Sequence, residues 1–400
     1  MIMRRHSGEE GNRLDQKNHD TERARGPASR DGAEVHIAGA GPAGLAAAIT
    51  LARAGRAVVV HEARKEVGCR FGGDLQGLEN WTTREDVLLA LEELGLTTDF
   101  NTVPCRQGTV FDPRGRRYEI RSEETLFYLV ERGPGPGTLD RALLEQARGL
   151  GVEVRFNHRL HRLEGEGILA AGPRAADAIA VGYHFETDMD DGYWVICDDR
   201  LAPGGYAYLL VMNGKGTVKS CLFRDFINER EYVQRTVEAF TRYVGLSMRN
   251  AVAHGGSGNF RIPQSAYSGR HPLIGEQAGF QDTLWGFGMR LAMTSGVLAA
   301  RSLIDGEDYD RLWKRALKPQ MDVSVVNRVL YGRLGERGYR WFVSWVASRP
   351  RLRESLRRQY GPSWMKSLLM PWARRRYVSQ RRDTHCHHAE CSCVWCRARC

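Results

Sequence analysis

The sequence lacks features that would place it among membrane or secreted proteins. It has no run of about 18 uncharged apolar residues, so a membrane-spanning helix is not expected. Residues 1–32 are polar and Arg-rich and lack the apolar stretch of a secretory signal. This segment also has too few large apolar side chains to offset its ordering entropy. We therefore expect a cytoplasmic protein whose residues 1–32 form a disordered arm.

Zinc modules are also missing, because no two CxxC units are separated by a long spacer. Four of the nine cysteines are scattered through the chain, and without a secretory signal we expect them to be reduced thiols. The other five lie with three histidines in the tail, residues 383–400. The tail is either a soft-metal site or an unordered reactive segment, and we assign no metal ligands to it.

Acidic residues are scarce only in the C-terminal part of the chain. The net charge is +10, but residues 307–382 alone carry 19 Lys and Arg against 6 Asp and Glu, which leaves the remainder at −3. This segment has a helical pattern in which Trp and Leu alternate with Arg. It is either a helix at a membrane interface, facing anionic lipid, or a basic cap over the protein core. No nucleic-acid reading module accompanies the charge, so we expect no nucleic-acid partner.

Three glycines near the start have the spacing of a dinucleotide-binding turn. Gly39, Gly41 and Gly44 follow a short strand-like run, and a helix rich in Ala and Leu continues to Gly55. A second apolar strand then ends in Glu62, eighteen positions after Gly44. Strand, glycine turn, helix, strand and acid follow one another in the order of the dinucleotide-binding unit.

Each part of this unit has a physical role. Gly39 makes the tight turn, Gly41 lets the main chain approach a pyrophosphate, and Gly44 lets helix and strand pack closely. The helix N-terminus directs amide donors and a positive dipole at the phosphates. Glu62 would accept hydrogen bonds from the adenosine ribose, and its charge disfavours the 2′-phosphate of NADP. The turn itself is completed by Ala40, Pro42 and Ala43.

A second glycine-rich segment lies more than two hundred residues downstream. In HPLIGEQAGFQDTLWGFGMRLAMTSG, residues 271–296, a short apolar run precedes a glycine-rich turn and a long helix of small and apolar residues. The two segments together resemble the FAD-dependent oxidoreductases of the hydroxybenzoate-hydroxylase fold, and among them the geranylgeranyl reductases. The resemblance implies that the cofactor is FAD.

The resemblance also implies roles for individual residues. Gly275 and Glu276 would hold the ribityl chain, with Glu276 in place of the usual Asp, while Gly286, Phe287 and Gly288 would lie against the isoalloxazine ring. Relatives have an Arg three positions before the helix that begins near Leu139. Here Pro136 occupies that place, and the nearest candidate for the cofactor contact is Arg132, displaced by GPGPG.

The segment from residue 186 to 226 is aromatic-rich and alternating, which predicts an antiparallel sheet. In geranylgeranyl reductases this sheet carries P-x-x-Y-x-W-x-F-P, whose aromatic side chains contact an isoprenoid chain. PGGYAYLLV keeps Tyr206 in register, with Tyr208 in place of Trp and Leu210 in place of Phe. These residues either form an apolar substrate wall or only pack a face of the sheet.

Cys69 lies after Glu62, where the reductases have a cysteine followed by glycines near the flavin. Arg70 and Phe71 intervene here before the glycines. The Cys69 thiol is either the proton donor that completes alkene reduction or an inert, small hydrophobic side chain.

The predicted fold is α/β, a Rossmann-like FAD-binding domain with an inserted antiparallel β-sheet substrate domain and a C-terminal helical extension. Residues 75–130 are expected to contribute in part to the substrate side. The expected domains are the FAD-binding domain (33–185 and 265–306), the substrate domain (186–264) and the basic extension (307–382).

The predicted function is reduction of carbon-carbon double bonds in an apolar, isoprenoid-like or lipid substrate by hydride transfer from reduced FAD. No second GxGxxG is present, so NAD(P)H would bind only transiently as electron donor, and reduced ferredoxin would serve equally. The main alternative is an FAD-dependent monooxygenase acting on an apolar or aromatic substrate. A flavin-dependent isomerising or binding protein at a membrane is the second alternative. If residues 307–382 are an interfacial segment and not a cap, they would contact the inner face of the cell membrane.

Overall fold

The computed structural model describes residues 34–173, 176–260 and 262–377. The expected arm (1–32) and the Cys/His-rich tail (383–400) lie outside these ranges. Four parallel strands form the sheet that carries the first glycine turn, in the order β8-β2-β1-β9. Their bounds are β1 (Val35–Ala38), β2 (Val58–His61), β8 (Glu153–Arg155) and β9 (Gly167–Leu169).

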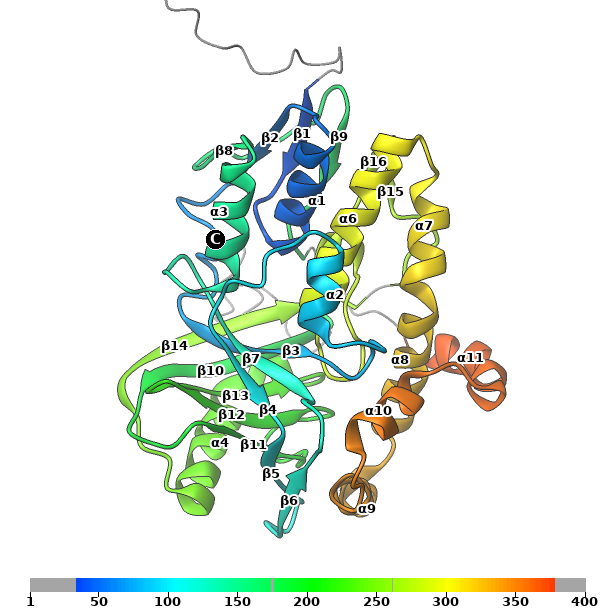
Figure 1. The fold of residues 1–400 in the computed structure, drawn as a ribbon. Helices are drawn as coiled ribbons and strands as arrows, with labels where there is room; N and C mark the ends of the chain where they lie inside the picture. Colours follow the sequence, from blue (N-terminus) through cyan, green and yellow to red (C-terminus); the bar gives the residue numbers. More distant parts are fainter. Residues whose placement is uncertain (1–33, 174–175, 261, 378–400) are drawn as a thin grey trace, which may run out of the picture. The chain divides into compact units, whose positions relative to one another are not determined.

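Helices pack on this sheet because their small and apolar faces are buried together. The helix of the first glycine turn, α1, lies directly against α6, the helix that follows the second glycine segment (Figure 1). A Cβ at Gly296 in α6 would lie 2.1 Å from the backbone oxygen of Ala43, so the two helices meet at backbone distance. The helices concerned are α1 (Pro42–Arg53), α3 (Leu139–Gly149), α5 (Gly275–Ala278) and α6 (Met289–Asp305).

A seven-stranded sheet forms the second part of the fold, in the order β14-β10-β13-β12-β11-β5-β6. All neighbouring pairs are antiparallel except β11 and β5, which run parallel. Helix α4 (Glu229–Val244) packs on one face of it, against β13 and β10. The strands are β5 (Gln107–Phe111), β6 (Arg117–Arg121), β10 (Ala178–Glu186), β11 (Gly192–Ile196), β12 (Tyr206–Met212), β13 (Lys215–Leu222) and β14 (Arg249–Gly258).

The side chains of β12 divide between the two faces of this sheet with the period of two that a strand imposes. Ala207, Leu209 and Val211 belong to the core under α4. Tyr206 and Tyr208 are on the opposite face and remain partly accessible. A smaller antiparallel sheet, β3-β7-β4, lies on that opposite face, with β3 in contact with β12 and β13. Its strands are β3 (Asp74–Glu79), β4 (Thr102–Cys105) and β7 (Phe127–Arg132).

The large sheet extends beyond the segment predicted for it. Strand β10, residues 178–186, was expected to belong to the FAD-binding part, yet all nine of its residues lie within the sheet between β13 and β14. The part of the sheet predicted from residue 186 therefore already starts at residue 178. The pairing partners of β10 lie 29 or more residues further along the chain, so its place in this sheet depends on the tertiary structure. Strands β5 and β6 also join the sheet, at its other edge.

Up to residue 377, where the described part of the chain ends, the C-terminal extension forms five helices, most of which pack on the core. Tyr309 and Trp313 of α7 are fully buried, so Trp313 does not lie with the interfacial aromatic residues proposed from the sequence. Buried Arg328 of α8 donates to the backbone oxygens of Leu284 and Gly204, which ties this helix to the turn before β12. The helices are α7 (Tyr309–Ala316), α8 (Lys318–Tyr331), α9 (Gly335–Ala347), α10 (Leu352–Tyr360) and α11 (Trp364–Arg376).

The cap interpretation of this extension holds for α7 to α10, because their apolar side chains join the cores of the protein. Exposed apolar side chains concentrate on α11. No helix within the described ranges combines the length and the apolarity needed to cross a bilayer. The remaining short elements are α2 (Val87–Glu93), β15 (Tyr267–Ser268), β16 (His271–Pro272) and a 3₁₀ turn (Phe226–Asn228).

Candidate active site

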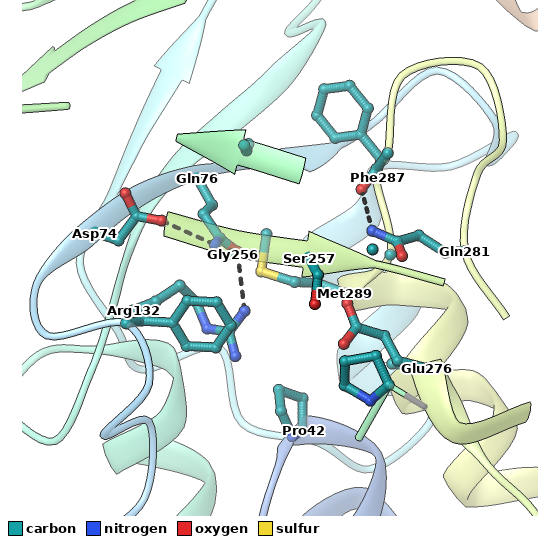
Figure 2. Close-up of a pocket in the computed structure, with 18 of the residues that line it drawn as sticks. Pro42, Asp74, Gln76, Arg132, Gly256, Ser257, Glu276, Gln281, Phe287 and Met289 are labelled. Atoms are coloured by element: carbon teal, nitrogen blue, oxygen red, sulfur yellow. Dashed lines mark hydrogen bonds between the residues drawn. The ribbon is translucent and has the colours of Figure 1, made fainter. Parts of the chain in front are cut away.

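One cavity brings together nearly all the residues that the sequence singles out. Its volume of about 1400 Å³ exceeds the roughly 300–1,000 Å³ of pockets that hold one small ligand, so it has room for a dinucleotide and a second molecule. Figure 2 shows part of its wall. The predicted site residues that border it are Gly39, Ala40, Gly41, Pro42, Ala43, Glu62, Cys69, Arg132, Tyr206, Tyr208, Leu210, Gly275, Glu276, Gly286, Phe287 and Gly288.

The three glycines of the first turn differ in what surrounds them. A Cβ at Gly39, which has a φ of +115°, would lie 2.3 Å from the backbone oxygen of Ala170. A Cβ at Gly44 would lie 2.0 Å from the backbone oxygen of Gly39, so this residue serves the packing of α1 and does not border the cavity. Gly41 has an ordinary φ of −74°, and a Cβ there would meet nothing within 4 Å. Only Gly41 keeps open the space in front of the turn.

This open space lies at the N-terminus of α1, which no side chain caps. The backbone amides of a first helical turn have no partner within the helix and, together with the helix dipole, favour an anion. Glu62 is beside the turn, and its carboxylate accepts hydrogen bonds from the backbone N–H groups of Ala40 and Arg64, each at 2.9 Å. The turn thus has an open, uncapped helix N-terminus with a carboxylate next to it, and the roles of these groups toward a pyrophosphate and a ribose stay predictions.

The second glycine segment forms a neighbouring part of the cavity wall, where a Cβ at Gly275 would lie 2.9 Å from the Cβ of Ala43 in the first turn. Gly275 has a φ of +57° and begins the short helix α5, and its backbone N–H donates to the Ser295 hydroxyl of α6 at 2.9 Å. The carboxylate of Glu276 accepts a hydrogen bond from Arg70 Nη1 at 2.9 Å, and Arg70 Nη2 donates to the backbone oxygen of Ser257 at 3.2 Å. Glu276 is therefore held by a cation that the sequence analysis did not select.

Gln281 provides a test of whether a flavin fits this wall. Its side-chain Nε2 donates to the backbone oxygen of Gly286 at 2.7 Å (Figure 2). Its Oε1 is buried and has no hydrogen-bond partner within the described part of the chain. A buried acceptor of this kind is costly unless a ligand donates to it, and the ring N–H of a flavin is such a donor. The open turn at Gly41, the uncapped α1 and this acceptor together fit FAD.

Phe287 lies on the cavity wall in contact with the β3 strand. A Cβ at Gly77 would lie 2.6 Å from the Phe287 ring, so a glycine at this position of β3 leaves the space that the ring occupies. The ring also meets Trp81 edge to face, with centroids 4.8 Å apart. These contacts fix the loop of residues 286–288 against the substrate side of the cavity.

Arg132 lies at the cavity, but its guanidinium is bound mainly to protein groups. Nε and Nη2 donate to the Asp140 carboxylate, each at 2.8 Å, and Nη1 donates to Gln76 Oε1 at 3.0 Å. Gln76 in turn donates to Asp74, so it joins both charged residues (Figure 2). Burial alone would lower the pKa of Arg132, but Asp140 raises it, and the guanidinium stays charged. It holds β7 to α3, and the predicted cofactor contact stays a prediction.

The residues predicted for the substrate wall face the cavity and do not only fill the sheet. Tyr206 and Tyr208 lie with their rings adjacent, at 5.8 Å between centroids, and the Tyr206 hydroxyl donates to the backbone oxygen of Trp285. This contact ties β12 to the loop that carries Gly286 and Phe287. The apolar part of the wall continues with residues that the sequence did not predict, namely Val110, Ile120, Leu126, Phe127, Tyr193, Val195, Phe342, Val343, Val346, Leu352 and Leu356.

Cys69 borders the cavity in the turn after β2, where it is half-buried. Its position agrees with a thiol that reaches a ligand, and whether it reacts stays a prediction. The cavity is also bordered by ionisable residues that the sequence did not predict for the site, above all Asp74, Lys219 and His254. In the segment GTVKSCLF, residues 217, 219 and 221 share one face of the strand. The sequence therefore carried a signal for Lys219, because this face is the one that Tyr208, its pairing partner on β12, presents to the cavity.

Known proteins resemble this chain in both sequence and fold. A sequence profile of the NAD(P)-binding Rossmann-like domain matches residues 37–74, which contain the first glycine turn and Glu62. A digeranylgeranylglycerophospholipid reductase from Haloferax volcanii is 23% identical over 373 residues, covering 77% of this chain and 88% of the relative. One from Methanosarcina acetivorans is 24% identical over 363 residues, covering 73% and 83%. The chain is related to the geranylgeranyl reductases.

Solved structures agree with this relationship at the level of the fold. A geranylgeranyl bacteriochlorophyll reductase-like protein from Thermoplasma acidophilum superposes with a TM-score of 0.67 at 17% identity, covering 86% of this chain and 98% of its own. The flavin-dependent brominase Bmp2 superposes with a TM-score of 0.61 at 14% identity, with the same coverage. The predicted recognition and fold class are thereby confirmed. The chain has the fold of FAD-dependent oxidoreductases, with an antiparallel sheet and a helical C-terminus.

Proposed function

We propose that this protein is an FAD-dependent oxidoreductase that reduces carbon-carbon double bonds of an isoprenoid lipid. The observation that carries the proposal is the single cavity that joins the dinucleotide turn to an apolar and aromatic wall. Non-directional burial against such a wall suits a long hydrocarbon chain, because the favourable free energy grows with the apolar area removed from water. The relatives from Haloferax and Methanosarcina are named for reduction of such lipids.

When bound, FAD supplies the hydride for the reduction. The protein itself binds and orients the cofactor and the lipid, and it excludes water from them. The N-terminus of α1 and Glu62 would hold the pyrophosphate and the adenosine ribose. Gly275 and Glu276 would hold the ribityl chain, and Gln281 would accept a hydrogen bond from the flavin ring. Tyr206 and Tyr208 keep a hydrocarbon against the loop of residues 286–288, to which Tyr206 is hydrogen-bonded through Trp285. The electron donor we propose is NAD(P)H or reduced ferredoxin, bound only during the transfer.

Anaerobic single turnover tests the proposed function. The FAD-loaded protein is reduced with dithionite under nitrogen and mixed with digeranylgeranylglycerophospholipid in detergent micelles. We expect the absorption of oxidised flavin to return and the lipid to gain two hydrogens per double bond, which mass spectrometry detects. A product that forms only when oxygen is admitted, heavier by one oxygen, would instead establish the monooxygenase. Absence of any change in the lipid under both conditions would leave the non-redox alternative.

We further propose that α11 contacts an anionic membrane from which the lipid is drawn. Trp364 and Leu368 are 73% and 70% exposed, and Met365 is exposed beside them. The helix contains four cations and no acid, with three arginines in its last turn. Exposed Trp and Leu next to Arg are typical of helices that lie in the interface of an anionic bilayer.

Vesicle sedimentation tests this contact. We expect the protein to bind phosphatidylcholine vesicles more strongly when phosphatidylglycerol is added, and more weakly at high salt. Trp364→Glu with Leu368→Glu should weaken binding about tenfold or more, because the bilayer would no longer bury these two apolar side chains on binding. Leu89→Glu, at an exposed position of α2, is the matched control and should bind like the unaltered protein. Equal binding of all three proteins would contradict the proposal.

A further inference from the structure

Lys219 is a buried lysine that borders the cavity, and neither the fold nor the wall explains its presence there. Its side chain is 2% exposed, and Nζ donates to Asp74 Oδ1 at 2.6 Å. Asp74 is equally buried. The desolvation of two such charges is seldom repaid by their attraction, so a buried ion pair contributes little to stability. A pair of this kind beside a ligand cavity points to a role in chemistry.

His254 forms a cluster with Lys219 and Asp74, because the sheet has a glycine between the strands of the lysine and the histidine. Lys219 on β13 and His254 on β14 both pair with Gly182, which lies between them on β10. Because Gly182 has no side chain, Lys219 Nζ reaches across it to His254 Nδ1, at 2.9 Å. His254 Nε2 lies 2.8 Å from the backbone oxygen of Arg70, which can only accept. Nε2 therefore carries the proton, and Nδ1 accepts a hydrogen bond from the Lys219 ammonium.

The register of the sheet places this ammonium next to the substrate wall. Lys219 pairs directly with Tyr208, and Cys221, two residues further along β13, pairs with Tyr206. Tyr206 is the residue hydrogen-bonded to the loop of residues 285–288. Two residues of a strand span about 7 Å. Lys219 therefore lies about 7 Å along β13 from Cys221, the residue that pairs with Tyr206 beside this loop. A hydrocarbon held on the two tyrosines would pass the ammonium.

We propose that Lys219 is the proton donor of the reduction, with Asp74 and His254 as the residues that position it. The inference rests on the proposed function. As the double bond is reduced, one carbon gains a hydride from the reduced cofactor, which is oxidised. The other carbon forms a bond to a proton from Lys219 Nζ, while the electron pair of the broken N–H bond stays on nitrogen. The neutral amine regains its proton from water after the product leaves.

The electrostatics of the cluster agree with this role. Burial of the ammonium lowers the pKa of Lys219, and Asp74 opposes this only in part. Burial alone would raise the pKa of Asp74, but Lys219 and His254 hold it below its usual range, so the carboxylate stays charged. The titratable or charged groups that face Lys219 are Asp74 from β3, His254 from β14, His184 from β10, Tyr208 from β12, Arg70 from the loop before β3 and Cys221 from its own strand.

The experiment compares Lys219→Met with Lys219→Met/Asp74→Asn. The single variant leaves a buried carboxylate unpaired and can fail to fold, whereas the double variant removes both charges. Lys215→Met is the matched control, because Lys215 is on the same strand but is half exposed and pairs with Glu131 at the surface. FAD content and thermal unfolding establish that the proteins are intact. We expect the double variant to bind FAD and to slow anaerobic single turnover about 10²- to 10⁴-fold, the usual contribution of a general acid.

Two further readouts separate proton donation from a structural role. In D₂O the hydride from dithionite-reduced flavin and the donated proton both carry solvent deuterium. The unaltered protein should therefore place two deuterium atoms per reduced bond in a single configuration, whereas the double variant should give a mixture of configurations at the protonated carbon. The turnover rate of the unaltered protein should fall as pH rises through the pKa of Lys219, because only the ammonium donates, and this inflection should be absent from the double variant. The chain has only seven lysines, so NMR of holoenzyme labelled with ¹³C-lysine should resolve Lys219. Its signal should titrate below the ordinary range of a lysine ammonium, and its absence from the Lys219→Met/Asp74→Asn spectrum should assign it.

Defined outcomes would overturn the inference while leaving the proposed function intact. Turnover by the double variant at the rate and with the pH profile of the unaltered protein would do so, as would a Lys219 signal that titrates in the ordinary range of a lysine ammonium. Loss of turnover in Cys69→Ser, with Lys219→Met/Asp74→Asn unaffected, would assign the proton to the thiol. If the unaltered protein transfers no reducing equivalents to the lipid, the proposed function itself fails.

Discussion

Gly41→Val is expected to abolish FAD binding while leaving the protein folded. The position has an ordinary φ of −74° and open space around its Cβ, so the backbone accepts a side chain without strain. The valine would occupy the space in front of α1 through which a pyrophosphate must pass. We expect affinity to fall about 100-fold or more, equivalent to roughly 3 kcal/mol. Fluorescence titration of the apoprotein with FAD measures this loss.

The stability of the apoprotein and a second glycine provide the controls. Valine is a poorer N-cap residue than glycine, so the free energy of unfolding should fall by about 1 kcal/mol at most. Gly149→Ala, at the exposed end of α3, introduces a Cβ that also meets nothing within 4 Å and does not border the cavity. This control should bind FAD normally and be as stable as the unaltered protein or slightly more so. FAD binding by Gly41→Val with unchanged affinity would refute the assignment of this turn.

Tyr206→Ala combined with Tyr208→Ala is expected to disable substrate handling while FAD stays bound. The two rings are adjacent on the cavity face of β12, and together they offer an apolar contact that alanine cannot replace. A loss of about 100 Å² of contact corresponds to roughly 2.5 kcal/mol and a decrease in kcat/KM of about 50- to 100-fold. Steady-state kinetics with the prenyl lipid and the flavin spectrum of the same samples measure the two properties.

The phenylalanine counterpart separates the aromatic surface from the hydroxyl groups. Tyr206→Phe with Tyr208→Phe keeps both rings and should retain most of the activity, although the hydrogen bond from Tyr206 to Trp285 is lost. Loss of FAD in the alanine variant would show that β12 supports the cofactor and not the substrate. Unchanged kinetics would remove the two tyrosines from the substrate wall.

Sequence reasoning was most successful where a function depends on local spacing. The first turn is contiguous from Gly39 to Gly44, and each glycine has a local reason: a positive φ at Gly39, open space at Gly41 and close packing at Gly44. Glu62 was found because the strand after the helix has a fixed place in the unit. Tyr206, Tyr208 and Leu210 share one strand face, so the period of two alone placed them together.

It was less successful where a residue's partner comes from elsewhere in the chain. Arg132 donates two hydrogen bonds to Asp140 and a third to Gln76, which lies 56 residues earlier, and its predicted cofactor contact stays a prediction. Glu276 is paired with Arg70, more than two hundred residues earlier. Trp313 lies among Lys and Arg residues in the sequence, a pattern typical of an interfacial helix. It is nevertheless fully buried, because α7 packs against the core.

The sequence by itself determined the dinucleotide unit, the family resemblance and the aromatic strand, because each depends on residues at fixed short intervals. The tertiary structure alone decided that α9 and α10 complete the apolar wall, and that Asp74, Lys219 and His254 meet in one cluster. These residues lie on three strands brought together by long connections and by the register across Gly182. The intervals between them in the chain carry no physical constraint, so only the folded sheet could reveal the contact.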